Sequence, residues 1–191
     1  MKIDENTSRE ELATIVSEAL AAAGFGAVLV GGSVVSIYTK ELFPSDDLDF
    51  VVNRRPIELE PTLRLLGFDQ FVNNIAIHPA ARYYVQLLDD TVAVGAKQPI
   101  RPVDFKTSVG MLRTLSPLDC VLDRLAAFLH YNDRPCLRQA VEVALQYGVP
   151  VDEVRQWFDA EPAPAEKKAE KLNEFVDRLE KLKLERDSRK R

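Results

Sequence analysis

The stretch of sequence that decides the fold runs from Ala27 to Val52 and reads AVLVGGSVVSIYTKELFPSDDLDFVV. It opens with Ala27–Val30, an apolar run of strand length that leads directly into two glycines. The segment Ser33–Leu42 that follows has the length of a short helix, and a proline-serine pair then turns the chain. Leu48–Val52 is a second short apolar segment. The stretch therefore predicts a strand, a helix and a second strand in succession.

Two glycines, Gly31 and Gly32, stand where the first predicted strand meets the predicted helix. Glycine permits a tight turn and lets a ligand approach the backbone closely, and the N–H groups at the start of a helix favour phosphate. A pair of glycines also marks many ordinary turns, so this motif alone does not decide for a phosphate site. A second motif is needed to choose between the two interpretations.

The second motif is Asp47-Leu48-Asp49-Phe50, in which acidic and apolar residues alternate. On a β-strand this alternation directs both carboxylates to one face and both apolar side chains to the other. Two neighbouring carboxylates repel each other unless a cation lies between them. Mg²⁺ prefers oxygen ligands and shares them with substrate phosphates, so the pair predicts a Mg²⁺ site. The alternative interpretation is an edge strand whose acidic face is exposed to solvent.

The order of the two motifs resembles the signature of the polymerase-β-type nucleotidyltransferase superfamily, which is hydrophobic-Gly-Gly/Ser, a short helix, and then Asp-hydrophobic-Asp-hydrophobic. The resemblance covers the stretch from Ala27 to Val52. It implies a mixed α/β (α+β) fold, with a nucleotidyltransferase-like core sheet and flanking helices. It further implies that Asp47 and Asp49 are catalytic and hold Mg²⁺ in a two-metal site. The residues that would bind the nucleotide are Gly31, Gly32 and Ser33.

The reaction that this resemblance implies is the transfer of a nucleoside monophosphate from an NTP to a hydroxyl group, with release of pyrophosphate. Three classes of acceptor are left open by the sequence: an RNA end, a protein side chain, and a small molecule such as an antibiotic. The oligomeric state is left open as well.

The superfamily needs a third carboxylate on a neighbouring strand. The strand where we expect it, residues 83–88, offers Gln86, whose amide can ligate a metal weakly but cannot act as a base. Asp104 lies between two apolar residues, the same pattern as in the acidic pair, and is therefore the candidate for the third catalytic carboxylate. If no acid reaches the site, we expect a degenerate relative that binds nucleotide or a partner protein without transfer. A third alternative is an interaction protein in which both motifs are coincidental.

The whole chain is predicted to have three parts: a nucleotidyltransferase-like α/β core over residues 1–114, a helical region packed on it over 115–160, and a charged C-terminal helix over 165–191. The core opens with a helix at Ser8–Gly24, because Ser8 and Glu11 form a capping box. The C-terminal helical bundle starts at Leu115-Ser116-Pro117, where serine is a good N-cap and proline suits the first helical position. The other predicted elements are a helix at Glu58–Leu66, strands at Phe71–Ile77, Arg82–Leu88, Thr91–Val94 and Pro102–Lys106, and helices at Pro117–Tyr131, Arg134–Tyr147 and Val151–Phe158.

From Leu115 to Arg134 the chain is similar, more loosely, to stand-alone bacterial nucleotidyltransferase-like proteins, among them relatives of AbiE-type toxins. Arg124 stands where these relatives carry a lysine, and Asp133-Arg134 is near their Arg-Asp motif in reversed order. The similarity implies that Arg124, or Lys106 in the core, adds positive charge at the nucleotide phosphates. It also implies a toxin–antitoxin setting.

The composition argues against several other classes of protein. A net charge of −5 over 191 residues does not suit a protein that coats nucleic acid by bulk electrostatics. No apolar run reaches the ~18–20 residues that a membrane span requires, so we expect no membrane partner. The polar and acidic start, Met1–Glu11, predicts no secretory signal. The two cysteines have no Cys/His cluster around them, and we interpret them as reduced thiols of a cytoplasmic protein.

Overall fold

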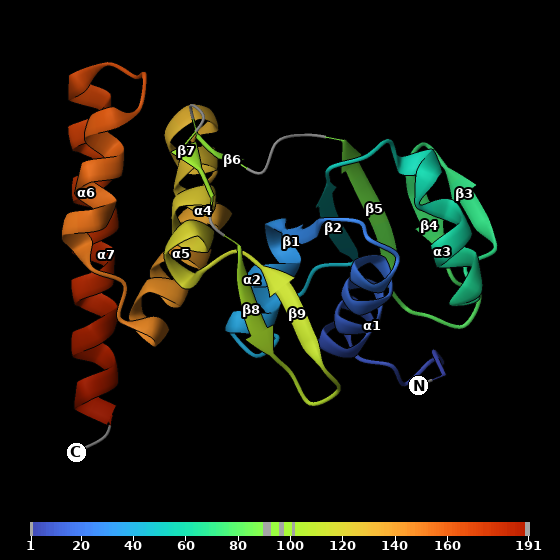
Figure 1. Ribbon diagram of the computed structural model, residues 1–191. Helices are drawn as coiled ribbons and strands as arrows, with labels where there is room; N and C mark the ends of the chain where they lie inside the picture. Colours follow the sequence, from blue (N-terminus) through green and yellow to red (C-terminus); the bar gives the residue numbers. More distant parts are fainter. Residues whose placement is uncertain (1, 90–92, 96–97, 101, 190–191) are drawn as a thin grey trace. The chain divides into compact units, whose positions relative to one another are not determined.

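The computed structural model describes residues 2–89, 93–95, 98–100 and 102–189 (Figure 1). The chain divides into two compact units, one made of residues 1–92 and 101–116 and the other of residues 93–100 and 117–191. A seven-stranded sheet with helices forms the first unit, and helices with a short hairpin form the second. The fold is thus the mixed α/β class with C-terminal helices that the sequence predicts. The predicted three-part division, with the helical region packed on the core, stays a prediction.

The sheet of the first unit consists of β1 (Ala27–Val30), β2 (Asp47–Val52), β3 (Gln70–Val72), β4 (Ile75–Ile77), β5 (Tyr84–Asp89), β8 (Val103–Lys106) and β9 (Met111–Thr114). Its strand order is β3-β4-β5-β2-β1-β9-β8. β1 pairs with β2 in antiparallel and with β9 in parallel orientation, and β2 pairs with β5 in parallel. β2 and β5 therefore lie in the interior of the sheet, whereas β3 and β8 form its edges.

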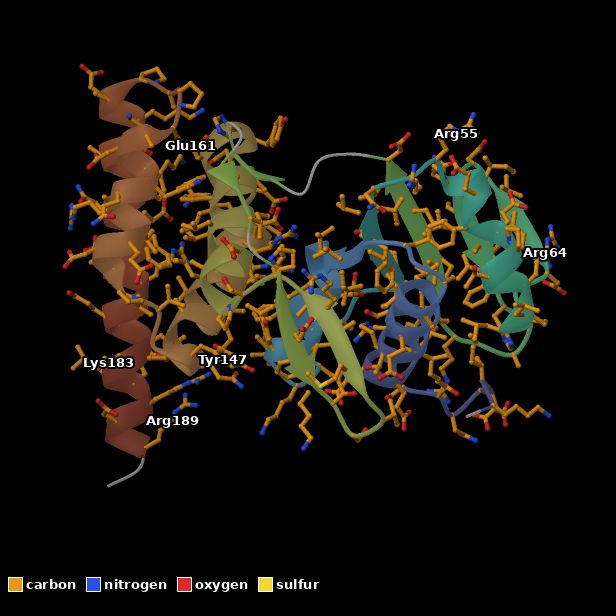
Figure 2. All side chains as sticks on the ribbon, in the orientation of Figure 1. Arg55, Arg64, Tyr147, Glu161, Lys183 and Arg189 are labelled. Atoms are coloured by element: carbon orange, nitrogen blue, oxygen red, sulfur yellow. The ribbon has the colours of Figure 1, made fainter. Side chains whose placement is uncertain are left out.

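The helices of the first unit are α1 (Arg9–Ala22), α2 (Gly31–Tyr38), the 3-10 turn η1 (Pro56–Glu58) and α3 (Glu60–Leu65). α1 begins at the predicted capping box: the Ser8 hydroxyl accepts the Glu11 N–H at 3.2 Å, and the Ser8 N–H donates to the Glu11 carboxylate at 2.8 Å. α1 packs against β1 and β9, and α2 packs against β1 and β2. Arg64 of α3 stacks over the Phe71 ring of β3, 4.4 Å from the ring centroid (Figure 2).

Alternating residues of β2 and β5 contribute to the core of the first unit. Leu48 and Phe50 of β2 are fully buried, and so are their register partners in β5, Val85 and Leu87. Register partners in a ladder project to the same side of the sheet, so these four side chains share one face. The residues between them therefore project to the opposite face.

Two sequence predictions within the sheet are wrong. The segment Phe71–Ile77 is not one strand but the hairpin of β3 and β4, which turns at Asn73-Asn74. The two asparagines have φ angles of 49° and 64°, as a two-residue hairpin turn requires, and asparagine tolerates this region well. The sequence also predicts no strand at Met111–Thr114, where β9 pairs with both β1 and β8. Residues 91 and 92 of the predicted strand Thr91–Val94 lie outside the described residues.

The second unit contains the short strands β6 (Ala93–Val94) and β7 (Gln98–Pro99) and the helices α4 (Pro117–Tyr131), α5 (Arg134–Tyr147), α6 (Val151–Ala160) and α7 (Ala165–Arg189). α4 and α5 have the predicted bounds. At the start of α5 the Asp133 side chain accepts the Cys136 N–H at 3.0 Å, and Gly148 ends this helix with a left-handed φ of 65°. α7 packs along α5 and buries Leu172 and Phe175. In the part of the chain that the structure describes, no helix has both the length and the apolar character that crossing a membrane requires.

Candidate functional site

The candidate site begins on β2. Asp47 and Asp49 are half-buried on one face of this strand, and Leu48 and Phe50 are fully buried on the other. The predicted alternation of the four residues is thereby confirmed. Because β1 and β5 flank β2 on both sides, the alternative interpretation as an edge strand is excluded.

Two polar side chains of β5 lie beside the acidic pair. The parallel register places Tyr84 next to Asp47 and Gln86 next to Asp49. Neighbouring strands are about 4.8 Å apart and register partners share a face, so the four side chains form one polar group on the sheet. Gln86 therefore occupies the position at which the superfamily resemblance predicts a third carboxylate.

Burial and the acidic residues nearby change the pKa of the Tyr84 phenol. Burial raises the pKa of Tyr84, and the negative charges of Asp47, Asp49 and Asp46 raise it further. The hydroxyl consequently stays protonated at neutral pH. In that state it can donate a hydrogen bond, but it cannot serve as a base.

The two glycines contact the second motif. Gly31 has a φ of +75°, in the left-handed region, and a Cβ at this position would lie 2.7 Å from Oδ2 of Asp49. A Cβ at Gly32 would lie 2.8 Å from the Ser45 hydroxyl oxygen. A side chain at either place would have to displace the Asp49 carboxylate or the Ser45 hydroxyl, which glycine leaves undisturbed. The structure thus brings the two motifs together in space, contrary to what the hypothesis of coincidental motifs predicts.

Ser33 has a role within the fold. Its hydroxyl donates to the backbone carbonyl oxygen of Asp47, and the residue is only 1% exposed. The side chain therefore ties α2 to β2. α2 begins at Gly31 rather than at Ser33. Its N-cap is Val30, and no capping side-chain hydrogen bond forms there within the described part of the chain. The donors that this helix can offer to a phosphate are the backbone N–H groups of its first turn.

The structure does not bring Asp104 to the acidic pair. Asp104 lies on β8, which β9 and β1 separate from β2. Three strand spacings of about 4.8 Å place it roughly 14 Å away across the sheet. Its carboxylate is 58% exposed and pairs with Arg113 at 3.2 Å. The geometry therefore does not support Asp104 as the third carboxylate, because the order of strands separates segments that share a sequence pattern.

The two predicted cations are Lys106 and Arg124. Lys106 is exposed on β8, on the same edge strand as Asp104. Arg124 belongs to α4 of the second unit, where its guanidinium pairs with the Asp123 carboxylate at 2.5 Å and donates to Sγ of Cys136 at 3.7 Å. Burial opposes the charged form, but the charge of Asp123 outweighs it and raises the pKa of Arg124. Arg124 is thus a permanent cation with partners in its own unit, and its contact with nucleotide phosphates stays a prediction.

The polar group offers oxygen atoms of the kind that bind magnesium together with a ligand, and the two-metal site stays a prediction. In the described residues, no three His, Cys, Asp or Glu side chains gather as they would around a metal held by protein alone. Asp47 and Asp49 offer two carboxylates, and Gln86 offers an amide oxygen. Mg²⁺ usually takes one or two protein carboxylates and completes its octahedral shell with water and substrate phosphates. The donor set has this composition.

Sequence reasoning missed two residues next to Asp47, namely Ser45 and Tyr84. The Ser45 hydroxyl donates to Oδ1 of Asp47 at 2.6 Å. The sequence contains a signal for Ser45. Residues two apart on an extended chain project to the same face, and Ser45 precedes Asp47 by two residues, as Asp47 precedes Asp49. Tyr84 precedes Gln86 by the same step, but its place beside Asp47 depends on the register of two strands that are distant in sequence.

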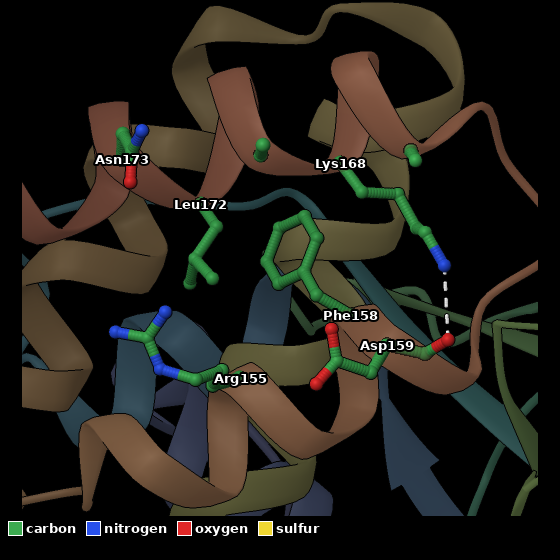
Figure 3. A pocket seen from close by; sticks show the side chains of 8 residues that line it. Arg155, Phe158, Asp159, Lys168, Leu172 and Asn173 are labelled. Atoms are coloured by element: carbon green, nitrogen blue, oxygen red, sulfur yellow. Dashed lines mark hydrogen bonds between the residues drawn. The ribbon is translucent and has the colours of Figure 1, made fainter.

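A hollow lies in the second unit between α6 and α7, with a volume of about 250 Å³ (Figure 3). Phe158 and Leu172 supply its apolar surface. The Lys168 ammonium group beside them donates to the carbonyl oxygens of Asp159 at 2.9 Å and Glu161 at 3.2 Å. The Lys168 ammonium group thereby donates hydrogen bonds to carbonyl groups at the end of α6. This interaction at the helix end, rather than ligand binding, explains the position of the lysine.

This chain resembles known proteins in its structure rather than in its sequence. No family model and no curated protein matches the sequence. An antigenic nucleotidyltransferase-like protein from Paracoccidioides brasiliensis matches with 11% identity and a TM-score of 0.63, over 94% of this chain and 92% of that one. The solution structure of the antibiotic-resistance factor ANT(2″)-Ia matches with 12% identity and a TM-score of 0.47, over 91% of this chain and 94% of that one. The crystal structure of ANT(2″)-Ia in complex with adenylyl-2″-tobramycin matches with 12% identity and a TM-score of 0.47, over 85% of this chain and 94% of that one.

The match to the Paracoccidioides brasiliensis protein shows that this chain has a nucleotidyltransferase-like fold. At an identity of 11% it shows the fold alone. The two matches to ANT(2″)-Ia have TM-scores of 0.47, which are too low to add evidence on the fold. The similarity to AbiE-type toxins and a bacterial origin stay predictions.

Proposed function

We propose that this chain is a nucleotidyltransferase, which binds a Mg²⁺–NTP and transfers its nucleoside monophosphate to a hydroxyl group. The observation that carries the proposal is the contact between the two motifs. The Asp49 carboxylate lies against the start of α2, 2.7 Å from the position of a Cβ at Gly31. Helix-end N–H groups and metal-binding carboxylates thus lie side by side, as recognition of a Mg²⁺–triphosphate requires.

In this proposal each part of the site has one task. The N–H groups at Gly31 and Gly32 bind the outer phosphates, and the carboxylates of Asp47 and Asp49 hold Mg²⁺. The metal, when bound, supplies positive charge that reduces the repulsion between the triphosphate and an approaching oxygen. The acceptor oxygen forms a bond to the α-phosphorus, and the bond from that phosphorus to pyrophosphate breaks. The hydroxyl proton passes to water, because Gln86 and the protonated Tyr84 are not bases.

Gln86 favours a second candidate function, which is nucleotide binding without transfer. An amide beside Asp49 leaves the phosphate and metal contacts in place but removes the group that would accept the proton of the acceptor. A protein of this kind would act as a nucleotide sensor or as an interaction module.

A thermal-melt comparison tests nucleotide binding. At a hundredfold excess of Mg²⁺–NTP over its dissociation constant, we expect about 2.7 kcal/mol of added stability, or a shift of roughly 5–10 °C. We expect the double substitution Asp47→Ala with Asp49→Ala, or removal of Mg²⁺ by EDTA, to abolish the shift. The absence of a shift with any of the four NTPs would contradict both candidate functions.

A transfer assay with NTPs labelled at the α-phosphate separates the two candidates. Incubation with RNA, with the protein alone and with hydroxylated small molecules reports the class of acceptor. The Gln86→Glu variant adds a carboxylate beside Asp49, and a general base typically contributes about 10²–10⁴-fold to a rate. Transfer by the wild type supports the first candidate, whereas transfer only by Gln86→Glu supports the second. Growth arrest on expression that requires Asp47 and Asp49 would support a toxin–antitoxin setting.

A further inference from the structure

The Ser45 hydroxyl lies between the two motifs. It donates to Oδ1 of Asp47 at 2.6 Å, and its oxygen is 2.8 Å from the position of a Cβ at Gly32. Ser45 thereby restricts the rotation of the Asp47 carboxylate next to the first turn of α2.

Arg9, at the start of α1, holds Ser45 in place. Only 2% of its side chain is exposed, so its guanidinium needs partners within the protein. Its Nε donates to the Ser45 carbonyl oxygen at 3.0 Å, and Nη2 donates to the same oxygen. Its Nη1 pairs with the Glu41 carboxylate, and its planar group lies 4.6 Å from the centroid of the Tyr83 ring. One side chain of α1 thus contacts two other segments of the first unit, residues 41–45 and the residue before β5, Tyr83.

The segment that Arg9 holds has a backbone that needs support. Lys40 and Glu41 have φ angles of 52° and 67°, two successive residues in a region that non-glycine residues rarely occupy. Such backbone persists only where its surroundings determine it, and it is commonest at functional sites. Ser36 provides part of that support: its carbonyl oxygen accepts the Glu41 N–H at 2.7 Å, and its hydroxyl donates to the Phe43 carbonyl oxygen. Arg9 of α1 adds the ion pair with Glu41 and the hydrogen bonds to the Ser45 carbonyl oxygen.

The contacts of Arg9 lie at the start of both strands of the site. Ser45 leads into β2, and Tyr83 leads into β5, whose first residue Tyr84 pairs with Asp47. These strands carry all four polar side chains of the candidate site. We infer that Arg9 and Ser45 are positioning residues of this site: Arg9 fixes Ser45, and Ser45 fixes the Asp47 carboxylate for Mg²⁺–NTP. The inference rests on the proposed function and names the residues that prepare its metal ligand.

Four variants test the inference with two measurements. Isothermal titration with Mg²⁺–NTP reports affinity, and hydrogen exchange of the backbone amides of residues 41–47, measured without nucleotide, reports whether the segment is held. Loss of a side chain that orients a metal ligand commonly weakens binding about 10–100-fold, and we expect this of Ser45→Ala. Ser45→Thr keeps the hydroxyl, and we expect it to bind within a few-fold of the wild type.

Arg9→Lys keeps the charge but loses the forked geometry, so we expect weaker binding together with faster exchange over residues 41–47. The matched control is Arg55→Lys, because Arg55 is an exposed arginine of the same unit that pairs with Glu58 at 3.0 Å (Figure 2). We expect this control to change neither measurement. Unfolding curves of all four variants show that each of them is folded.

The outcomes separate this inference from the proposed function. If the wild type binds no Mg²⁺–NTP, the proposed function fails, and hydrogen exchange alone decides whether Arg9 holds the segment. Unchanged exchange over residues 41–47 in Arg9→Lys overturns the inference in either case. So does a wild-type affinity of Ser45→Ala, or an equal loss in Ser45→Thr, because each would mean that the hydroxyl does not orient Asp47.

Discussion

Asp49 on β2 and Asp104 on β8 each lie between two apolar residues, yet the fold gives them different environments. β2 lies inside the sheet, between β5 and β1, whereas β8 forms an edge. The apolar neighbours of Asp49 are fully buried, and those of Asp104 are half-buried. The same local pattern therefore belongs to the centre of the core in one strand and to its margin in the other.

The partners of the two acids differ as much as their burial. The Asp49 carboxylate lies against Gly31 and beside Gln86, next to the start of a helix. The Asp104 carboxylate pairs with the half-exposed Arg113 on the neighbouring strand. An alternating pattern thus predicts the face on which an acid lies, whereas the order of strands decides what the acid meets.

The largest expected difference concerns the apolar neighbours of the two acids. We expect Phe50→Ala to lower the free energy of unfolding by about 3–5 kcal/mol, because it empties a fully buried position. Phe105 is half-buried and meets the Tyr38 ring edge-on, with a centroid distance of 5.5 Å, so Phe105→Ala should cost only about 1–2 kcal/mol. Urea unfolding followed by circular dichroism measures both. Equal losses would contradict the contrast between interior and edge strands.

The next difference concerns the acids themselves. We expect Asp49→Asn to lose most of the approximately 2.7 kcal/mol that saturating Mg²⁺–NTP adds to the wild type. Asp104→Asn should keep all of it, because the sheet order separates its carboxylate from the site. Thermal melts with and without nucleotide report both values. A comparable loss in Asp104→Asn would show that Asp104 reaches the nucleotide after all.

A third difference lies in the glycine that makes room for Asp49. Gly31 and Gly24 both have left-handed backbone, with φ of +75° and +83°, so an alanine costs roughly 1–2 kcal/mol at either position. A Cβ at Gly24 meets no atom within 4 Å, whereas one at Gly31 meets the Asp49 carboxylate at 2.7 Å. We therefore expect Gly31→Ala to lose more stability than Gly24→Ala and to bind Mg²⁺–NTP more weakly. Identical behaviour of the two variants in unfolding and titration experiments would refute the contact.

The smallest expected effect is that of the Asp104–Arg113 pair. Both partners are about half exposed, so solvent screens their attraction and the pair should contribute at most about 0.5–1 kcal/mol. We expect Arg113→Ala to reduce the stability by no more than this amount, and about 1 M salt to remove the difference from the wild type. A larger or salt-resistant loss in denaturant titrations would indicate a structural role for the pair.

The sequence alone predicts the features that depend on neighbouring residues. It predicted α4 and α5 with the correct bounds, because Pro117, Asp133 and Gly148 mark helix ends through local hydrogen bonds and local backbone geometry. It also predicted the strand–helix–strand unit and the common face of Asp47 and Asp49, since side-chain alternation is a property of a single strand. The turn at Asn73-Asn74 is equally local, because asparagine tolerates the left-handed backbone that this turn requires.

The tertiary structure, in contrast, sets which polar groups meet. The Ser33 hydroxyl donates to the backbone carbonyl oxygen of Asp47, whereas the Ser45 hydroxyl donates to the Asp47 carboxylate. The fold places Gln86 beside Asp49 and leaves Asp104 three strands away. These neighbours follow from strand order and register, which are set by the burial of apolar faces on segments far apart in the chain. No local pattern contains that information, because the energies that choose the arrangement arise only when the segments pack together.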